Sequence, residues 1–199
     1  MHENGLIKHI IIVGLNIRQP QIIGMGFMLD IQSKYIKRKT NMKKILFVLS
    51  QLSTGGAERV ISILANNFDI RGYEVHLITY VDVPNAYTLN KEILWTKFPS
   101  ISGNRIKQHL TRMRLIRKYI RDNKIDTYIT FEHYYGWTCA FKNHVRYITS
   151  MRNDPLHDKL SIMERFLRKL NFVYASAVVF QTSEIMDYFS NSVQKHGYI

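Results

Sequence analysis

The sequence has little cysteine and no long apolar run. With Cys139 as the single cysteine in 199 residues, the chain can build neither an internal disulfide framework nor a multi-cysteine zinc site, which suits a reducing cytoplasm. We expect this thiol to be small and buried. A membrane-spanning helix needs about 20 successive apolar residues, and the best candidate, Ile10 to Ile17, is short and followed by Arg18. The sequence therefore predicts a cytoplasmic protein without a transmembrane helix.

Acidic residues are also scarce. There are 15 Asp and Glu residues against 28 Lys and Arg residues, which gives a formal net charge of +13. This balance predicts attraction to phosphates on nucleic acid, anionic lipid or a sugar nucleotide, and charge alone does not choose among them. Because the sequence contains no helix-turn-helix, zinc or aromatic-strand RNA motif, nucleic acid is not an expected partner.

The first 41 residues differ from the rest of the chain. The apolar run from Ile10 is followed by a Gly- and Met-rich stretch and then by the basic run Lys37 to Lys39. The segment Met42 to Val48 looks like a natural start that leads directly into a strand. We therefore expect residues 1–41 to be an N-terminal extension outside the fold. The alternative is an amphipathic arm that touches a membrane, and N-terminal sequencing of the native protein would decide between the two.

Short apolar runs alternate with longer amphipathic segments over residues 42–199. This alternation is typical of βαβ units, and it predicts a Rossmann-like α/β domain with a doubly wound parallel sheet. The expected strands are 45–49, 73–80, 93–98, 125–131, 146–151 and 177–181. The expected helices are 58–70, 103–123, 160–174 and 183–189. Another strand or a linker is expected to begin at Tyr198.

A glycine-rich segment, Leu49 to Arg59, joins the first expected strand to the first expected helix. Glycines at Gly55 and Gly56 would let the backbone approach a ligand and would leave the first N–H groups of the helix facing an anion. The alternative is a tight turn in which Ser53 or Thr54 caps the helix. The segment is neither a Walker A loop nor a dinucleotide-binding fingerprint.

Four segments of the chain resemble a known family. Gly55 to Val60, after the Lys-Ile-Leu-Phe-Val strand, resembles the N-terminal domain of family 4 retaining glycosyltransferases. Arg71 to Thr79, Ser150 to Pro155 and Ala177 to Ser183 are similar to further segments of that family in the same order, with Tyr73 where the family often has His. The resemblance covers roughly residues 43–199.

The resemblance implies one half of a GT-B fold, whose N-terminal domain takes the acceptor and whose C-terminal domain takes the nucleotide-sugar. It implies transfer of a hexose or N-acetylhexosamine, from a donor such as a UDP-sugar, to a polysaccharide or lipid-linked oligosaccharide, with no metal and no other cofactor. The resemblance implies that Gly55 and Gly56 line the cleft beside the acceptor and the donor phosphates. Arg152 and Asn153 are acceptor contacts at the end of a strand.

The segment that follows the fourth expected strand combines a carboxylate, an imidazole and aromatic rings. Glu132 and His133 are the candidate catalytic residues, since either could hydrogen-bond a sugar hydroxyl. Members of the family often have a His close to this position. The alternative for His133 is a histidine at the edge of the core or in an exposed loop.

The family's donor signature, a spaced pair of Glu residues in the second domain, has no room in this sequence. We therefore expect an acceptor-side half without its C-terminal donor domain, with little transferase activity alone, because the groups that stabilise the leaving nucleoside diphosphate are absent. The alternative is a non-catalytic acceptor-binding subunit that pairs with a separate donor-domain protein. The downstream reading frame would distinguish a truncated gene from a split enzyme.

A basic face is expected on the helix 103–123. Apolar side chains repeat on its inner side at Ile106, Leu110, Met113, Ile116 and Ile120. The other sides carry Arg105, Lys107, Arg112, Arg114, Lys118 and Arg121, and later basic residues extend the face at Lys159, Arg165, Arg168 and Lys169. This pattern predicts peripheral binding to an anionic membrane surface, and the alternative is an ordinary solvated face.

Overall fold

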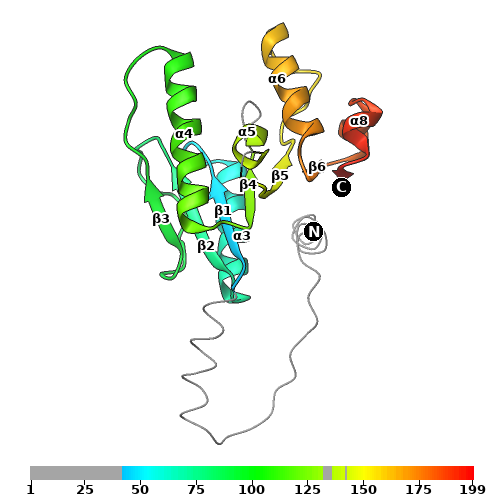
Figure 1. Ribbon diagram of the computed structural model, residues 1–199. Helices are drawn as coiled ribbons and strands as arrows, with labels where there is room; N and C mark the ends of the chain where they lie inside the picture. The colour runs from blue at the N-terminus through cyan, green and yellow to red at the C-terminus, as the bar shows by residue number, and fades with distance from the viewer. Residues whose placement is uncertain (1–41, 132–135, 142) are drawn as a thin grey trace, which may run out of the picture.

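A computed structural model describes residues 42–131, 136–141 and 143–199 (Figure 1). The expected N-terminal extension, residues 1–41, lies outside the described residues. The candidate catalytic residues Glu132 and His133 lie outside them as well.

A seven-stranded parallel sheet forms the centre of the described chain, in the order β3-β2-β1-β4-β5-β6-β7. The strands are β1 (Lys44–Val48), β2 (Glu74–Thr79), β3 (Leu94–Lys97), β4 (Thr127–Thr130), β5 (Arg146–Ser150), β6 (Ala177–Val179) and β7 (Gly197–Tyr198). The inner strand β1 is apolar on both faces because helices cover it on both sides. The predicted doubly wound sheet is therefore confirmed, including a further strand at the end of the chain.

Helices cover the sheet on both faces. They are α3 (Gly56–Ile70), α4 (Arg105–Asn123), α5 (Gly136–Phe141), α6 (Ile162–Val173), α7 (Ser183–Asp187) and α8 (Asn191–Gln194). Ile61 and Phe68 of α3 pack in one core cluster, whereas Ile116 of α4 and Phe172 of α6 pack in the other. Figure 1 shows α4 and α6 on the side of the sheet opposite to α3.

Local side-chain chemistry sets several helix ends. Ser161 and Glu164 form a capping box at the start of α6. Asn104 caps α4, since its Oδ1 accepts a hydrogen bond of 2.9 Å from the Lys107 N–H. After α3 the chain turns at Gly72, whose φ of +83° lies in the left-handed region that favours glycine. These ends agree with the predicted helices to within a few residues.

Two parts of the fold differ from the sequence-based expectation. The short helices α5 and α8 were not predicted, because six and four residues show no clear helical period. Cys139 on α5 is fully buried as expected, and burial raises the pKa of its thiol to about 12. The expected inner side of α4 is only partly correct: Ile116 and Ile120 are buried, whereas Ile106 is 70% exposed and Leu110 is 44% exposed. The first turns of α4 therefore present apolar side chains to solvent.

Candidate functional site

The carboxyl ends of β1 and β4 define the place where a ligand is expected. From β1 the chain continues through α3 to β2 on one side, and from β4 it continues through α5 to β5 on the other side. The connections therefore diverge between β1 and β4, and such a switch point is where open α/β sheets bind ligands. Gly55 and Gly56 follow β1, and Arg152 and Asn153 follow β5, the neighbour of β4.

Residues 49–56, which we call the glycine turn, are held in place by the connection that follows β2. The N–H of Tyr80 donates to the carbonyl of Ser50 at 3.1 Å, and the N–H of Ala86 donates to that of Leu52 at 3.0 Å. The Tyr87 hydroxyl accepts from the Gly55 N–H at 3.2 Å and donates to the Gly55 carbonyl at 2.9 Å. The backbone of the glycine turn is thus fixed from one side.

The start of α3 is open at the glycines. Gly55 is the N-cap, with no side-chain hydrogen bond capping the helix, so the alternative in which Ser53 or Thr54 caps it is wrong. The first backbone bond of the helix runs from the Arg59 N–H to the Gly55 carbonyl, at 3.0 Å. The preceding N–H groups in the helix therefore have no acceptor within it.

The two glycines have different surroundings. A Cβ atom added to Gly55 would overlap the Glu58 carboxylate, which folds back over the turn, whereas one added to Gly56 would meet no atom within 4 Å. Gly56 is exposed and has no positive φ. Neither the fold nor any described neighbour requires glycine there, and the open space suits the approach of a ligand to the backbone.

Arg152 carries a positive charge at the same edge of the sheet. Its guanidinium carbon lies 5.5 Å from the centre of the Phe131 ring, so the exits of β4 and β5 are in contact. Burial lowers the pKa of Arg152, but an arginine stays protonated at neutral pH. Within the described ranges no carboxylate forms an ion pair with Arg152. The neighbouring Asn153 is exposed.

Trp137 belongs to the aromatic group that the sequence indicated near Glu132 and His133. Its ring stacks on Tyr174, with the ring centres 5.2 Å apart, and its backbone N–H donates to Asn171 Oδ1 at 3.1 Å. Trp137 thus helps to attach α5 to α6.

Two residues of the expected basic face pack their guanidinium groups against the domain. The Arg112 guanidinium carbon lies 4.1 Å from the centre of the Tyr80 ring, and the Nε atom of this arginine is buried. Arg168 is 4% exposed and forms a 2.6 Å ion pair with Asp158. The buried Arg168 therefore does not belong to an exposed basic face, whereas Arg112 remains partly exposed.

The remaining basic residues of α4 fall into two groups. Lys107 and Arg114, in the half that carries the exposed Ile106 and Leu110, are exposed. Lys118 and Arg121 are exposed too, but both pair with the Asp122 carboxylate. Arg105 is the first residue of α4, and its side chain is not described.

In the described part of the chain, no helix is both long and apolar enough to cross a membrane. Over the same residues, no three His, Cys, Asp or Glu side chains gather where they could hold a metal ion.

Gly55, Gly56 and the ends of β4 and β5 lie within a segment that matches a known family. The sequence profile of Glycosyltransferase Family 4 matches residues 54–194. The chain belongs to this family. A curated relative is the GalNAc-α-(1→4)-GalNAc-α-(1→3)-diNAcBac-PP-undecaprenol α-1,4-N-acetyl-D-galactosaminyltransferase of Campylobacter jejuni. The two are 26% identical over 161 residues, which cover 77% of this chain and 44% of the relative.

Solved structures agree with the family at the level of the fold. A glycosyltransferase from Rickettsia africae matches with a TM-score of 0.58 and 21% identity, over 79% of this chain and 42% of that one. Anabaena HepE in complex with UDP and glucose matches with a TM-score of 0.61 and 16% identity, over 78% and 43%. The fold is thus the expected Rossmann-like half of a GT-B glycosyltransferase. This chain spans less than half the length of each of these relatives.

The sequence did not indicate that Tyr87 belongs to the site. Tyr87, which fixes the Gly55 backbone, lies between the expected strands 73–80 and 93–98, and no motif surrounds it. Its partner is 32 residues away in the sequence, so no local pattern could have indicated the contact.

Proposed function

We propose that this chain supplies the acceptor-binding half of a glycosyltransferase. One observation carries the proposal. The open start of α3 at Gly56 and the guanidinium of Arg152, which has no described carboxylate partner, lie at the same edge of the sheet. Gly55, Gly56, Arg152 and Asn153 bind a sugar or lipid-linked acceptor and its phosphates there. Glu132 and His133, which lie outside the described residues, are proposed to carry the catalytic hydrogen bonds.

The donor in this proposal is a nucleotide-sugar, such as a UDP-sugar that carries a hexose or N-acetylhexosamine. A second, donor-binding domain holds most of it, either in the same polypeptide or as a separate protein, and the sugar is transferred with retention of configuration. The complex of HepE with UDP and glucose supports this donor class. The name of the Campylobacter relative supports an acceptor linked through PP to undecaprenol.

The experiment combines the purified chain with a donor half. Sugar transfer from UDP-GalNAc to a pyrophosphate-linked acceptor is measured with the chain alone and with the donor half of the Campylobacter relative added. We expect little turnover with the chain alone and clear turnover with both. Full turnover by the chain alone would contradict the proposed division of labour, and acceptor binding without turnover in any combination would favour the non-catalytic subunit.

The exposed start of α4 is proposed to rest on an anionic membrane surface, at the cytoplasmic face of the membrane. Ile106 and Leu110 supply apolar contact, and Lys107 and Arg114 flank them with charge that no described carboxylate pairs. Each cation near such a surface contributes about 1 kcal/mol. This position suits a half-enzyme that takes a lipid-linked acceptor.

A further inference from the structure

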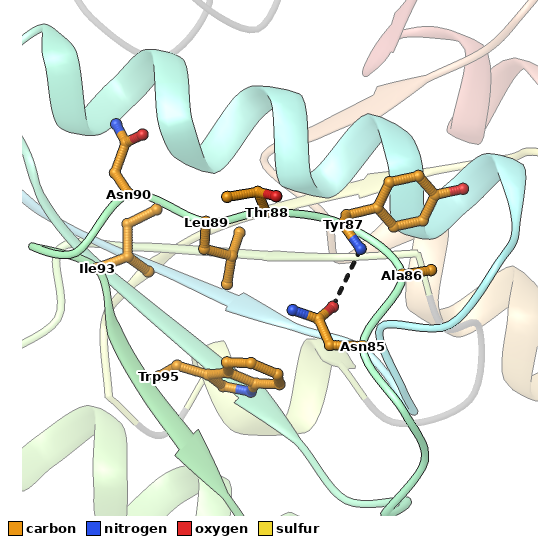
Figure 2. A pocket seen from close by; sticks show the side chains of 8 residues that line it. All are labelled: Asn85, Ala86, Tyr87, Thr88, Leu89, Asn90, Ile93 and Trp95. Carbon is orange, nitrogen blue, oxygen red and sulfur yellow. Dashed lines mark hydrogen bonds between the residues drawn. The ribbon is translucent and has the colours of Figure 1, made fainter.

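A groove of about 400 Å³ lies beside the glycine turn, between the connection that follows β2 and the edge strand β3. Figure 2 shows the eight residues that line it: Asn85, Ala86, Tyr87, Thr88, Leu89, Asn90, Ile93 and Trp95. The volume falls at the lower end of the range for small-molecule sites, about 300–1,000 Å³. None of the residues assigned above to the acceptor or its phosphates lines this groove.

Residues 80–93, between β2 and β3, contain no helix, whereas each other pair of consecutive strands is joined by at least one. The wall of the groove is nevertheless well fixed. Asn66 on α3 donates from Nδ2 to the Thr88 carbonyl at 3.0 Å, and its Oδ1 accepts from the Asn90 N–H at 2.8 Å. Asn90 also donates to the Asp69 carboxylate at 2.8 Å. A preformed wall of this kind loses little conformational entropy when a ligand binds.

The lining contains no charged residue, although the chain has a net charge of +13. The Lys97 ammonium lies 5.3 Å from the centre of the Trp95 ring, but it pairs with the Asp82 carboxylate at 3.0 Å. A phosphate would therefore find better partners elsewhere on the molecule. The groove instead combines apolar surface from Leu89, Ile93 and Trp95 with amide groups. The Trp95 indole is held by a 3.1 Å hydrogen bond from its Nε1 to Thr79 Oγ1. A neutral ligand with an apolar face and several hydroxyl groups fits this chemistry.

Asn85 provides a donor that points into the groove. Its Oδ1 accepts from the Tyr87 N–H at 3.2 Å, and Figure 2 shows its NH₂ group directed toward Leu89 and Trp95. Among the described residues, nothing accepts a hydrogen bond from this NH₂ group. It is therefore available to a hydroxyl or acetamido oxygen of a ligand.

Tyr87 joins the groove to the site at the carboxyl edge. The residue lines the groove, and its hydroxyl makes both hydrogen bonds to the Gly55 backbone. A ligand that extends from the glycine turn along this connection would enter the groove directly.

We propose that the groove is a subsite for the neutral saccharide part of the acceptor, with Trp95 as its apolar wall and the Asn85 NH₂ group as a hydrogen-bond donor. The proposal rests on the proposed function, because it assumes an acceptor that carries several sugar rings. It adds a second contact region, separate from Arg152 and specific for uncharged sugar.

The test titrates the chain with the methyl glycoside of GalNAc-α-(1→4)-GalNAc, the disaccharide at the start of the Campylobacter substrate name, and follows the indole N–H signals by NMR. The chain has two tryptophans, and a Trp95→Phe variant assigns their signals. We expect a saturable shift of the Trp95 signal with the disaccharide and none with inorganic phosphate. The Asn85→Asp variant keeps the acceptor for the Tyr87 N–H but loses the NH₂ donor, and we expect at least fivefold weaker binding.

Asn191→Asp is the matched control, since it makes the same charge change at an exposed position on α8, and it should bind as the wild type does. Thermal melts check that each variant is folded. The proposal is overturned if the Trp95 signal does not respond, or if Asn85→Asp binds the disaccharide as tightly as the wild type. If Asn85→Asp, combined with the donor half, transfers sugar with the acceptor KM of the wild type, the groove is not a saccharide subsite, and the proposed function stands. If the chain binds the disaccharide but no sugar is transferred even with the donor half present, the groove is kept and the transferase function is rejected.

Discussion

Charged residues at the amino ends of β1 and β2 are paired with one another, whereas Arg152, just after the carboxyl end of β5, has no described ion-pair partner. At the amino end, the Lys44 ammonium lies 2.8 Å from the Glu74 carboxylate, which in turn lies 2.9 Å from Nε2 of His76. The buried His76 uses its other ring nitrogen, Nδ1, to contact the Tyr119 hydroxyl at 2.9 Å. At the carboxyl end, Arg152 has an aromatic ring beside it and no described ion-pair partner.

This contrast separates a structural role from a binding role. At the amino end, the charged side chains are paired with one another and stabilise the fold. Because their charges are already neutralised by these partners, they would bind a ligand only weakly. Desolvation lowers the pKa of His76 despite the neighbouring Glu74, so the ring is neutral at pH 7. An arginine without a described carboxylate partner, half-buried at the same edge of the sheet as the start of α3, is instead suited to an anionic ligand.

Substitution of Arg152 tests the carboxyl end, and we expect the largest effect there. Removing one partner of a partly buried charged contact costs about 2–5 kcal/mol. Arg152→Ala should therefore weaken binding of a pyrophosphate-linked disaccharide acceptor about a hundredfold, as measured by titration calorimetry. Thermal stability should change little, because no ion pair of the fold is lost.

Arg71→Ala is the matched control for this substitution. Arg71 is exposed and follows α3 at the opposite end of the sheet, so its loss removes the same charge far from the site. Equal weakening by both variants would mean that only the overall charge matters, and the contrast between the two ends would be lost.

The sequence predicted the fold better than it predicted the site. Apolar strand runs such as 45–49 and the glycine after α3 are local signals, and the strands and most helices followed from them. The packing of Arg112 on Tyr80 and the hydrogen bonds of Tyr87 to Gly55 join segments that are distant in the sequence. Single-sequence periodicity carries no information on such contacts, so both contacts were missed.

His76→Ala tests the amino end. Loss of the buried imidazole leaves the Tyr119 hydroxyl without its close partner and opens a cavity, which should cost about 2.5 kcal/mol of unfolding free energy. Urea denaturation measures this cost. Binding of the acceptor by the folded variant should remain within twofold of the wild type, since the residue lies away from the site.

The pH dependence of stability offers a control for the His76 variant. Desolvation lowers the pKa of His76 in the folded protein, so the His76 ring binds a proton more readily in the unfolded chain. The stability that the neutral ring contributes is therefore fully present above the pKa of the unfolded chain, about 6.5. It is lost as the pH falls through the lower pKa of the folded protein. The wild type should therefore lose more stability than His76→Ala between pH 7 and pH 5. His157→Ala, at an exposed histidine, should behave as the wild type.

The two halves of α4 show the same difference between paired and unpaired charges. Lys118 and Arg121 pair with Asp122 in the second half, whereas Lys107 and Arg114 have no described carboxylate partner. Replacing Lys107 and Arg114 by Gln removes two cations that lack described carboxylate partners, at about 1 kcal/mol each near an anionic bilayer. Sedimentation with anionic liposomes should show roughly thirtyfold weaker binding. The same replacements at Lys118 and Arg121, which pair with Asp122, should have a smaller effect. A similar loss in both double variants would favour an ordinary charged face.

The smallest expected effect, at Gly56, separates folding from binding within the glycine turn itself. A methyl group there meets no described atom within 4 Å, and alanine is the better helix former, so Gly56→Ala should fold at least as stably as the wild type. If the acceptor phosphates approach this backbone, the methyl group should weaken acceptor binding about fivefold. Gly72→Ala should show the opposite behaviour. Because the φ of Gly72 is +83°, an alanine there should lower the unfolding free energy by about 1 kcal/mol, and acceptor binding should not change. Unchanged acceptor binding in Gly56→Ala would remove the helix start from the proposed site and leave Arg152 as its main anion contact.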